Sequence, residues 1–113
     1  MKNIKKLSIV VPVYNEEKTV ALILKKIFEV DFGKVNLEVI VVNDGSKDKT
    51  LEILEKLKKK YPIKLVTYKD NRGKSSALRE GFKHVTGDVV TVQDGDLEYS
   101  PRDFNKMLKK MLE

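Results

Sequence analysis

The segment LEVIVV at residues 37–42 is apolar at every position except Glu38. A short run of this kind, rich in β-branched residues, predicts a strand that is buried on both faces of a sheet. The segment LSIVV at residues 7–11 has the same character and predicts a second central strand. Residues 63–68 and 88–92 predict two further strands. The strand at residues 63–68 is more polar, so we expect it near an edge of the sheet.

Amphipathic stretches follow the predicted strands, and their apolar residues recur every three or four positions, as on a helix with one buried face. These residues are Val20, Ile23, Leu24, Ile27 and Phe28; Leu51, Leu54 and Leu57; Ala77, Leu78, Gly81, Phe82 and Val85; and Phe104, Met107, Leu108, Met111 and Leu112. Ser46 and Asp48 are candidate caps for the second helix, and Gly87 is a candidate C-terminal cap for the third.

The alternation of strands and helices predicts an α/β fold with a mostly parallel, four-stranded sheet and helices on both faces. Right-handed crossovers favour the strand order 3-2-1-4, which is half of a doubly wound, Rossmann-like fold. In such sheets, ligands bind at the carboxyl ends of the strands near the point where the order reverses. The residues that follow each strand are therefore the place to look for a site.

The composition bounds the class of protein. A chain of 113 residues with 41% hydrophobic content and no internal linker predicts a single domain over residues 1–113. No apolar stretch approaches about 20 residues and there are no cysteines, so we expect a cytoplasmic protein without disulfides or thiolate metal sites. The net charge of +6 comes from lysines interspersed with acids on helical faces, which argues against a nucleic-acid partner. Attraction to an anionic membrane surface stays open.

The residues after the four strands have complementary chemistry. Asp94 and Asp96 surround a glycine after the fourth strand, and two carboxylates on one turn suit a hard divalent cation, although Asp-Gly is also a common turn. Asp44 follows the second strand and suits a base or ribose, while Arg72 and Lys74 supply positive charge for phosphates. Together they predict a nucleoside-diphosphate site.

Other phosphate-binding motifs do not fit these residues. A dinucleotide fingerprint needs glycines after the first strand, and residues 12–17 contain none. Gly73-Lys74-Ser75 resembles the end of a P-loop, but Tyr68 occupies the position of the required upstream glycine. A receiver domain needs an acidic pair directly after the first strand, where this chain has Pro12-Val13-Tyr14.

Five segments in order resemble the donor-binding half of a family-2 glycosyltransferase. They are SIVVPVYNE at residues 8–16, VNDGSKDKT at 42–50, NRGK at 71–74, TGD at 86–88 and QDGDLE at 93–98. Within that family, the chain is most similar to polyprenol-phosphate sugar transferases of the dolichol-phosphate mannose synthase type. The resemblance implies a GT-A fold.

The resemblance also implies roles for individual residues. Pro12, Tyr14 and Glu16 match the segment that lines the nucleotide, and Asp44 matches the acid that contacts the base. Three acidic residues, Asp94, Asp96 and Glu98, match positions that hold the donor diphosphate through Mg²⁺ or Mn²⁺. Gly95 replaces the commoner alanine of the Asp-x-Asp turn without removing a ligand.

The implied substrate is a GDP- or UDP-sugar, and the implied reaction is inverting transfer to a polyprenyl phosphate, which would place the protein at the cytoplasmic membrane surface. The family continues beyond the helix after Asp-x-Asp, so no acceptor or catalytic residue is predicted here and little transfer is expected from residues 1–113 alone. A non-catalytic nucleotide-binding or assembly module remains the alternative. His84 is expected on the surface. The exposed edge of the fourth strand, residues 89–92, predicts a homodimer, and the alternative is a monomer whose last helix, residues 104–112, covers that edge.

Overall fold

A computed structural model describes residues 4–94, in which four strands and three helices alternate along the chain. The elements are β1 (Lys6–Val13), α1 (Val20–Glu29), β2 (Asn36–Asp44), α2 (Thr50–Lys60), β3 (Ile63–Tyr68), α3 (Lys74–Phe82) and β4 (Val89–Val92). All strand pairs are parallel, and the order in the sheet is β3-β2-β1-β4. The predicted α/β class and strand order are confirmed.

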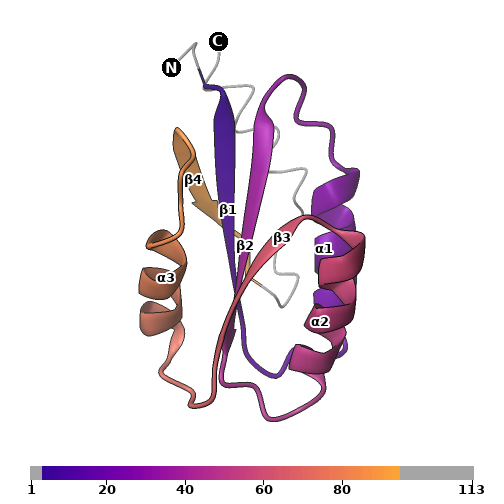
Figure 1. The fold of residues 1–113 in the computed structure, drawn as a ribbon, viewed down its shortest axis with the longest axis vertical. Coiled ribbons are helices and arrows are strands. Elements are labelled where there is room, and N and C mark those ends of the chain that lie inside the picture. Colours follow the sequence, from indigo (N-terminus) through magenta and orange to yellow (C-terminus); the bar gives the residue numbers. More distant parts are fainter. Residues whose placement is uncertain (1–3, 95–113) are drawn as a thin grey trace.

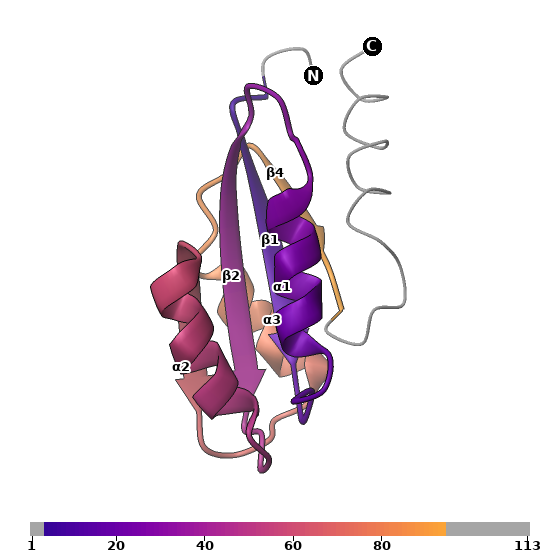
Figure 2. The same cartoon turned by 90° about the vertical axis from the view of Figure 1, so that its right-hand side faces the viewer.

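The described residues form three layers, with α3 on one face of the sheet and α1 and α2 on the other (Figure 1). Figure 2 shows α1 and α2 side by side in front of the strands. The face toward α1 and α2 carries the larger core, in which Ile9, Val41 and Leu24 are fully buried. The face toward α3 has a smaller core around Val10 and Ala77.

The strand pairing explains why the sheet has two central strands and two edge strands. β1 pairs with β2 along its whole length, from Lys6 beside Asn36 to Val13 beside Asn43. β3 pairs only with β2 among the described strands and lies at the edge, as its polar residues predict. β4 pairs only with residues 7–10 of β1 in the same part of the chain, so it forms the opposite edge.

Within residues 4–94, the apolar positions of the predicted helix faces are buried or partly buried except Leu51 and Phe82, which are 36% and 47% exposed. On α2, the buried positions are Thr50 and Leu54, and helix geometry places Leu51 about 100° from Thr50 and about 60° from Leu54, at the flank of the buried face. On α3, the backbone of Gly81 approaches the sheet so closely that an added Cβ would lie 2.5 Å from a methyl group of Val10. The next residue, Phe82, therefore points outward. No helix within residues 4–94 is long and apolar enough to cross a membrane.

The predicted helix caps are only partly correct. Lys49 is the N-cap of α2, so Ser46 does not cap it, but Asp48 accepts a hydrogen bond from the backbone N–H of Thr50 (2.9 Å), the first residue of α2. α3 ends at Phe82, so Gly87 does not cap it. A Cβ added to Gly87 would instead lie 2.5 Å from Oγ of Ser8 on β1, which shows that Gly87 allows the chain before β4 to approach β1. The helix expected near residues 100–112 lies outside the described residues.

Glu38, the one charged residue in the apolar segment at residues 37–42, is the centre of a polar cluster near the start of β2. Its carboxylate accepts hydrogen bonds from the hydroxyl of Ser8 (2.7 Å), the ammonium of Lys64 (2.8 Å) and the backbone N–H of Thr86 (2.9 Å). Burial alone would raise the pKa of Glu38, but these bonds outweigh it and hold the pKa well below its usual range. The cluster connects β1, β2 and β3 to the segment that leads into β4.

Candidate nucleotide site

The loops after the strands meet at the carboxyl edge of the sheet, at the lower end of Figure 1, where they surround a pocket of about 250 Å³. This volume is near the lower end of the range of about 300–1,000 Å³ that is common for small-molecule sites. The lining residues come from all four strand ends and from α3: Pro12, Val13, Tyr14, Glu16, Asp44, Asn71, Gly73, Lys74, Ala77 and Asp94. The pocket lies where the chain order reverses between β1 and β4, as predicted for this topology.

The loops after β1 and β2 are joined by reciprocal hydrogen bonds. The backbone N–H of Asn15 donates to Oγ of Ser46 (2.9 Å), and the backbone N–H of Lys47 donates to the side-chain oxygen of Asn15 (2.8 Å). Asn15 has a φ of 50°, which asparagine tolerates better than most residues. Its conformation therefore positions both loops at once.

A second set of bonds joins the same two loops closer to the helices. The hydroxyl of Thr50, a fully buried residue at the start of α2, accepts a hydrogen bond from the backbone N–H of Glu16 (2.9 Å). Asp48 accepts one from the backbone N–H of Glu17 (3.3 Å). The pKa of Asp48 would be raised by burial, but hydrogen bonds from Thr50 and Glu17 lower it, so its carboxylate is held ionised. These contacts position Glu16 on the wall of the pocket.

Asp44 joins the loops after β2 and β3. The residue is 3% exposed, and its two carboxylate oxygens accept four hydrogen bonds from one neighbouring segment. The donors are the Tyr68 hydroxyl (2.6 Å), the Asn71 amide (2.8 Å) and the backbone N–H groups of Arg72 (2.9 Å) and Gly73 (3.0 Å). Since a carboxylate has about four lone-pair sites, a base contact by Asp44 requires one of these bonds to be shared or replaced.

Gly45 lets the same two loops touch. It has a φ of +67°, and an added Cβ would lie 2.4 Å from the backbone nitrogen of Asn71. Both the left-handed conformation and the missing side chain are needed here, because the opposing atoms belong to the backbone and cannot move aside easily. The wall of the pocket between β2 and β3 therefore depends on this glycine as well as on Asp44.

Arg72 and Lys74, both predicted to meet phosphates, are placed differently. The guanidinium of Arg72 stacks on the ring of Tyr68, 4.2 Å from its centroid, and Arg72 is not among the lining residues. Lys74 lines the pocket, and its Nζ lies 2.7 Å from Oδ1 of Asp94. Burial, the hydrogen bond to Asp44 and the charge of Asp44 raise the pKa of Tyr68, so its hydroxyl remains a donor.

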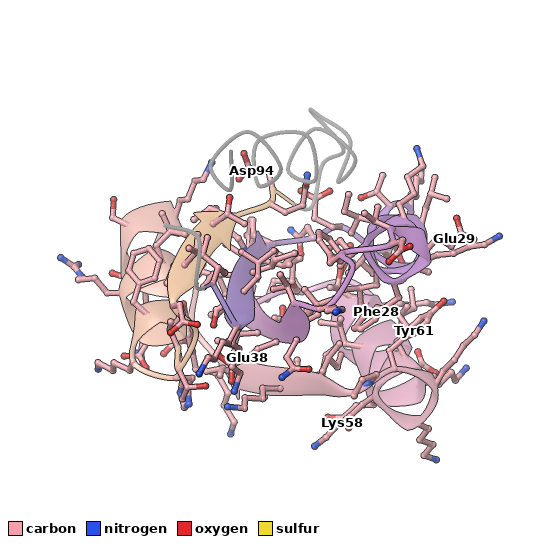
Figure 3. The ribbon with its side chains drawn as sticks, turned by 90° about the horizontal axis from the view of Figure 1, so that it is seen from above. Phe28, Glu29, Glu38, Lys58, Tyr61 and Asp94 are labelled. Atoms are coloured by element: carbon pink, nitrogen blue, oxygen red, sulfur yellow. The ribbon has the colours of Figure 1, made fainter. Side chains whose placement is uncertain are left out.

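Asp94 is the only member of the predicted acidic turn within residues 4–94; Asp96 and Glu98 lie outside the described residues. The ladder between β1 and β4 continues through a hydrogen bond from the Gln93 N–H to the carbonyl of Val10 (3.0 Å), which places Asp94 directly at the pocket. Figure 3 shows Asp94 just beyond the end of β4. Within the described part of the chain, no group of three or more His, Cys, Asp or Glu side chains forms a metal site. Within residues 4–94, Asp94 is therefore the one described member of the predicted cation site, and its carboxylate holds the ammonium of Lys74.

The structure therefore brings six of the predicted nucleotide-binding residues to one pocket: Pro12, Tyr14, Glu16, Asp44, Lys74 and Asp94. Sequence reasoning missed the roles of Tyr68 and Asn71, which hold Asp44. Tyr68 lies directly beside Asp44 in the register of β2 and β3, so a correct register would have identified the pair. Asn71 stands in the NRGK segment that carried the resemblance, where its amide could have been matched to Asp44.

Comparisons with known proteins agree with this arrangement. The family model for glycosyl transferase family 2 matches residues 8–113. A dolichol-phosphate mannosyltransferase from Pyrococcus furiosus is 36% identical over 104 residues, which are 92% of this chain and 29% of that protein.

Solved structures of glycosyltransferases have the same fold. The mannosyltransferase PcManGT from Pyrobaculum calidifontis, in complex with GDP-Man and Mn²⁺, superposes with a TM-score of 0.83 and 30% identity, over 95% of this chain and 32% of that one. S. aureus TarS 1-349 in complex with UDP-GlcNAc gives a TM-score of 0.78 and 32% identity, over 92% of this chain and 30% of that one. The chain spans less than a third of each of these three relatives. With a family model that covers nearly the whole sequence, the chain belongs to glycosyl transferase family 2.

Proposed function

We propose that the pocket binds the nucleoside diphosphate of a GDP- or UDP-sugar together with Mg²⁺ or Mn²⁺, as the donor site of an inverting glycosyltransferase. The observation that carries this proposal is the meeting of Asp94, Lys74 and Asp44 in one pocket at the switch point of the sheet. The complexes of PcManGT with GDP-Man and Mn²⁺ and of TarS with UDP-GlcNAc support it.

Each part of the donor has a proposed partner. Pro12, Tyr14 and Glu16 line the nucleoside, and Asp44 meets the base by sharing one of its four hydrogen-bonding positions. Lys74 and, after leaving the Tyr68 ring, Arg72 neutralise phosphate charge. Asp94 would hold the cation, joined by Asp96 and Glu98 from outside the described residues.

The proposed reaction needs stabilisation of the leaving group more than it needs a base. The acceptor oxygen attacks the anomeric carbon of the sugar while the bond to the β-phosphate oxygen breaks, and the configuration inverts. When bound at Asp94, the cation would supply positive charge that stabilises the departing nucleoside diphosphate. A polyprenyl phosphate, suggested by the name of the Pyrococcus furiosus relative, is already an anion and can attack without strong general-base catalysis. Such an acceptor would place the protein at the cytoplasmic membrane surface.

Calorimetric titration with GDP, UDP and pyrophosphate, in Mn²⁺ and in excess EDTA, tests the donor site. We expect nucleoside diphosphates to bind only with the cation, and equal affinity in EDTA would contradict the proposal. Asp44→Ala should weaken GDP or UDP more than pyrophosphate if Asp44 contacts the base. Equal weakening of all ligands would leave Asp44 with only the loop-holding role seen in its hydrogen bonds.

A further inference from the structure

Lys74 and Asp94, which both line the pocket, form an ion pair. Lys74 is the first residue of α3 and Asp94 follows β4, so the pair joins two elements that are not neighbours in the sequence. The Nζ–Oδ1 distance is 2.7 Å. The side chain of Lys74 is 60% exposed, whereas that of Asp94 is only 14% exposed. A largely exposed ammonium therefore neutralises a largely buried carboxylate.

The position of Lys74 on its helix makes this pairing notable. The first turn of α3 contains no acidic residue, and the N-terminus of a helix carries positive potential, which disfavours a lysine there. Asp94 offsets that disfavoured charge. An anion such as a phosphate, placed in the same pocket, could replace Asp94 as the partner of Lys74, because both are oxygen acceptors of negative charge.

A divalent cation at Asp94 and the ammonium of Lys74 compete for the same carboxylate. Even if each took a different oxygen, the two positive charges would lie within a few ångströms and repel each other. We propose that Lys74 competes with the cation for the carboxylate of Asp94. Its ammonium binds Asp94 when no ligand is bound, and it moves to the phosphates when nucleotide and cation bind together. This inference rests on the proposed function, since it needs a phosphate ligand and a cation in this pocket.

The exchange makes nucleotide and cation binding depend on each other. A cation that arrives alone must displace Lys74 and leave it without Asp94. A cation that arrives with a nucleoside diphosphate finds Lys74 already engaged by phosphate. By linkage, the nucleotide then raises cation affinity by the same factor by which the cation raises nucleotide affinity. The exchange at Lys74 produces part of this increase in affinity, and direct contact between cation and phosphate produces the rest.

Electron paramagnetic resonance of free Mn²⁺ measures cation binding directly, without any assay of activity. The proteins to compare are the wild type, Lys74→Met, Lys74→Arg and the control Lys25→Met. Lys25 is also 60% exposed and pairs with Glu29 on α1, so its removal changes the net charge equally but away from the pocket. We expect Lys74→Met to bind Mn²⁺ alone about threefold tighter or more, as expected for release of a partly exposed ion pair, while Lys74→Arg and Lys25→Met resemble the wild type.

Repeating the titration with saturating GDP or UDP measures the coupling. The factor by which nucleotide tightens Mn²⁺ binding should be smaller in Lys74→Met than in the wild type. The double variant Lys74→Met, Asp94→Asn should lose the gain in Mn²⁺ affinity; a gain that survives in it would overturn the inference, because the cation would then bind elsewhere.

The possible failures can be told apart. Unchanged Mn²⁺ affinity in Lys74→Met, with normal Mn²⁺-dependent nucleotide binding in the wild type, overturns the role of Lys74 and leaves the proposed function intact. Failure of the wild type to bind any nucleotide with Mn²⁺ overturns both. Circular dichroism and thermal melting verify that each variant is folded, and Lys74→Gln provides the same charge change if Lys74→Met is not.

Discussion

The hydroxyl of Tyr68 donates a hydrogen bond of 2.6 Å to Oδ1 of Asp44, which joins the ends of two neighbouring strands, β3 and β2. The same tyrosine ring carries the guanidinium of Arg72 on its face. One side chain thus holds both a buried carboxylate of the pocket wall and a cation that we expect to move toward phosphates. Its hydroxyl and its ring have separate tasks, which a single-atom substitution can separate.

Tyr68→Phe should remove the hydroxyl and keep the ring. We expect the free energy of unfolding to fall by about 1–2 kcal/mol, because a hydrogen bond to a buried, charged acceptor is lost. Urea denaturation followed by circular dichroism measures the change. Tyr61→Phe is the matched control, since the Tyr61 ring stacks on Phe28 between α1 and α2 (Figure 3) and should keep that contact. Equal effects of the two variants would contradict the importance of the Asp44 contact.

Asp94→Asn and Asp96→Asn should each weaken Mn²⁺-dependent binding of GDP or UDP by at least about 1 kcal/mol, because each removes a charged ligand of the proposed cation. Calorimetry in Mn²⁺ measures the loss. Asp31→Asn, in the turn between α1 and β2, is the control and should bind like the wild type. Wild-type affinity in both aspartate variants would argue that the cation, if needed, is held by other residues.

Glu38→Gln should lower the free energy of unfolding at pH 7 by roughly 2 kcal/mol, since Glu38 accepts bonds from Ser8, Lys64 and Thr86. The pKa of Glu38 in the folded protein lies below the ordinary value of 4.5. Its contribution is therefore complete above that value and is lost as the pH falls, because the unfolded chain takes up a proton first.

The difference between wild type and Glu38→Gln should consequently shrink as the pH is lowered from about 5 toward 3. Chemical denaturation at a series of pH values measures it. Glu29→Gln, on an exposed pair with a 3.9 Å separation, should change the stability by less than about 0.5 kcal/mol. A difference for Glu38→Gln that stays constant down to pH 3 would show that its effect is not that of an ionised carboxylate.

Gly45→Ala and Gly33→Ala form a matched pair, because the two glycines have φ values of +67° and +68°. Both variants should lose about 1 kcal/mol for the left-handed conformation. Only at Gly45 would the new Cβ meet backbone atoms, at 2.4 Å, so that variant should lose roughly 2–4 kcal/mol in total and bind nucleotide more weakly. Thermal melting and calorimetry check both effects, and equal losses would mean that the loops can separate without cost.

The edge of β4 carries the prediction of a homodimer. Val90 is 41% exposed, and β4 lies at the end of the sheet. We expect two copies to pair through their fourth strands about a two-fold axis, and Val90→Lys to dissociate them by placing like charges at the contact. Light scattering over a dilution series measures the mass. A monomer at tens of micromolar concentration would exclude this contact.

Much of the fold follows from local patterns. The apolar segments at residues 7–11 and 37–42 became the central strands, and the polar character of residues 63–68 correctly predicted an edge. These features depend on the average burial of a whole segment, and the pattern of apolar and polar residues in the sequence predicts that average well. The position of the site follows in turn from the topology, because parallel strands bring their carboxyl ends together.

What sequence reasoning missed depends on contacts between distant residues. Glycine is common at the C-terminal caps of helices, yet the role of Gly87 is set by its close approach to the hydroxyl of Ser8 on β1. Leu51 and Phe82 fit an apolar stripe, but close packing at Thr50 and Gly81 rotates them outward. Likewise, Asp44 as a free ligand is a natural expectation until the register places Tyr68 beside it. Local propensity contains no information about such partners.

The reciprocal bonds between the loop of Asn15 and the loop of Ser46 have a practical consequence for engineering. An insertion in either loop would break its hydrogen bonds to the other loop. This end of the molecule is therefore a poor place to graft a foreign peptide. The turn around Gly33 at the opposite end has open space, with no atom within 4 Å of an added Cβ. A fluorescent label or affinity tag inserted there would leave the pocket undisturbed.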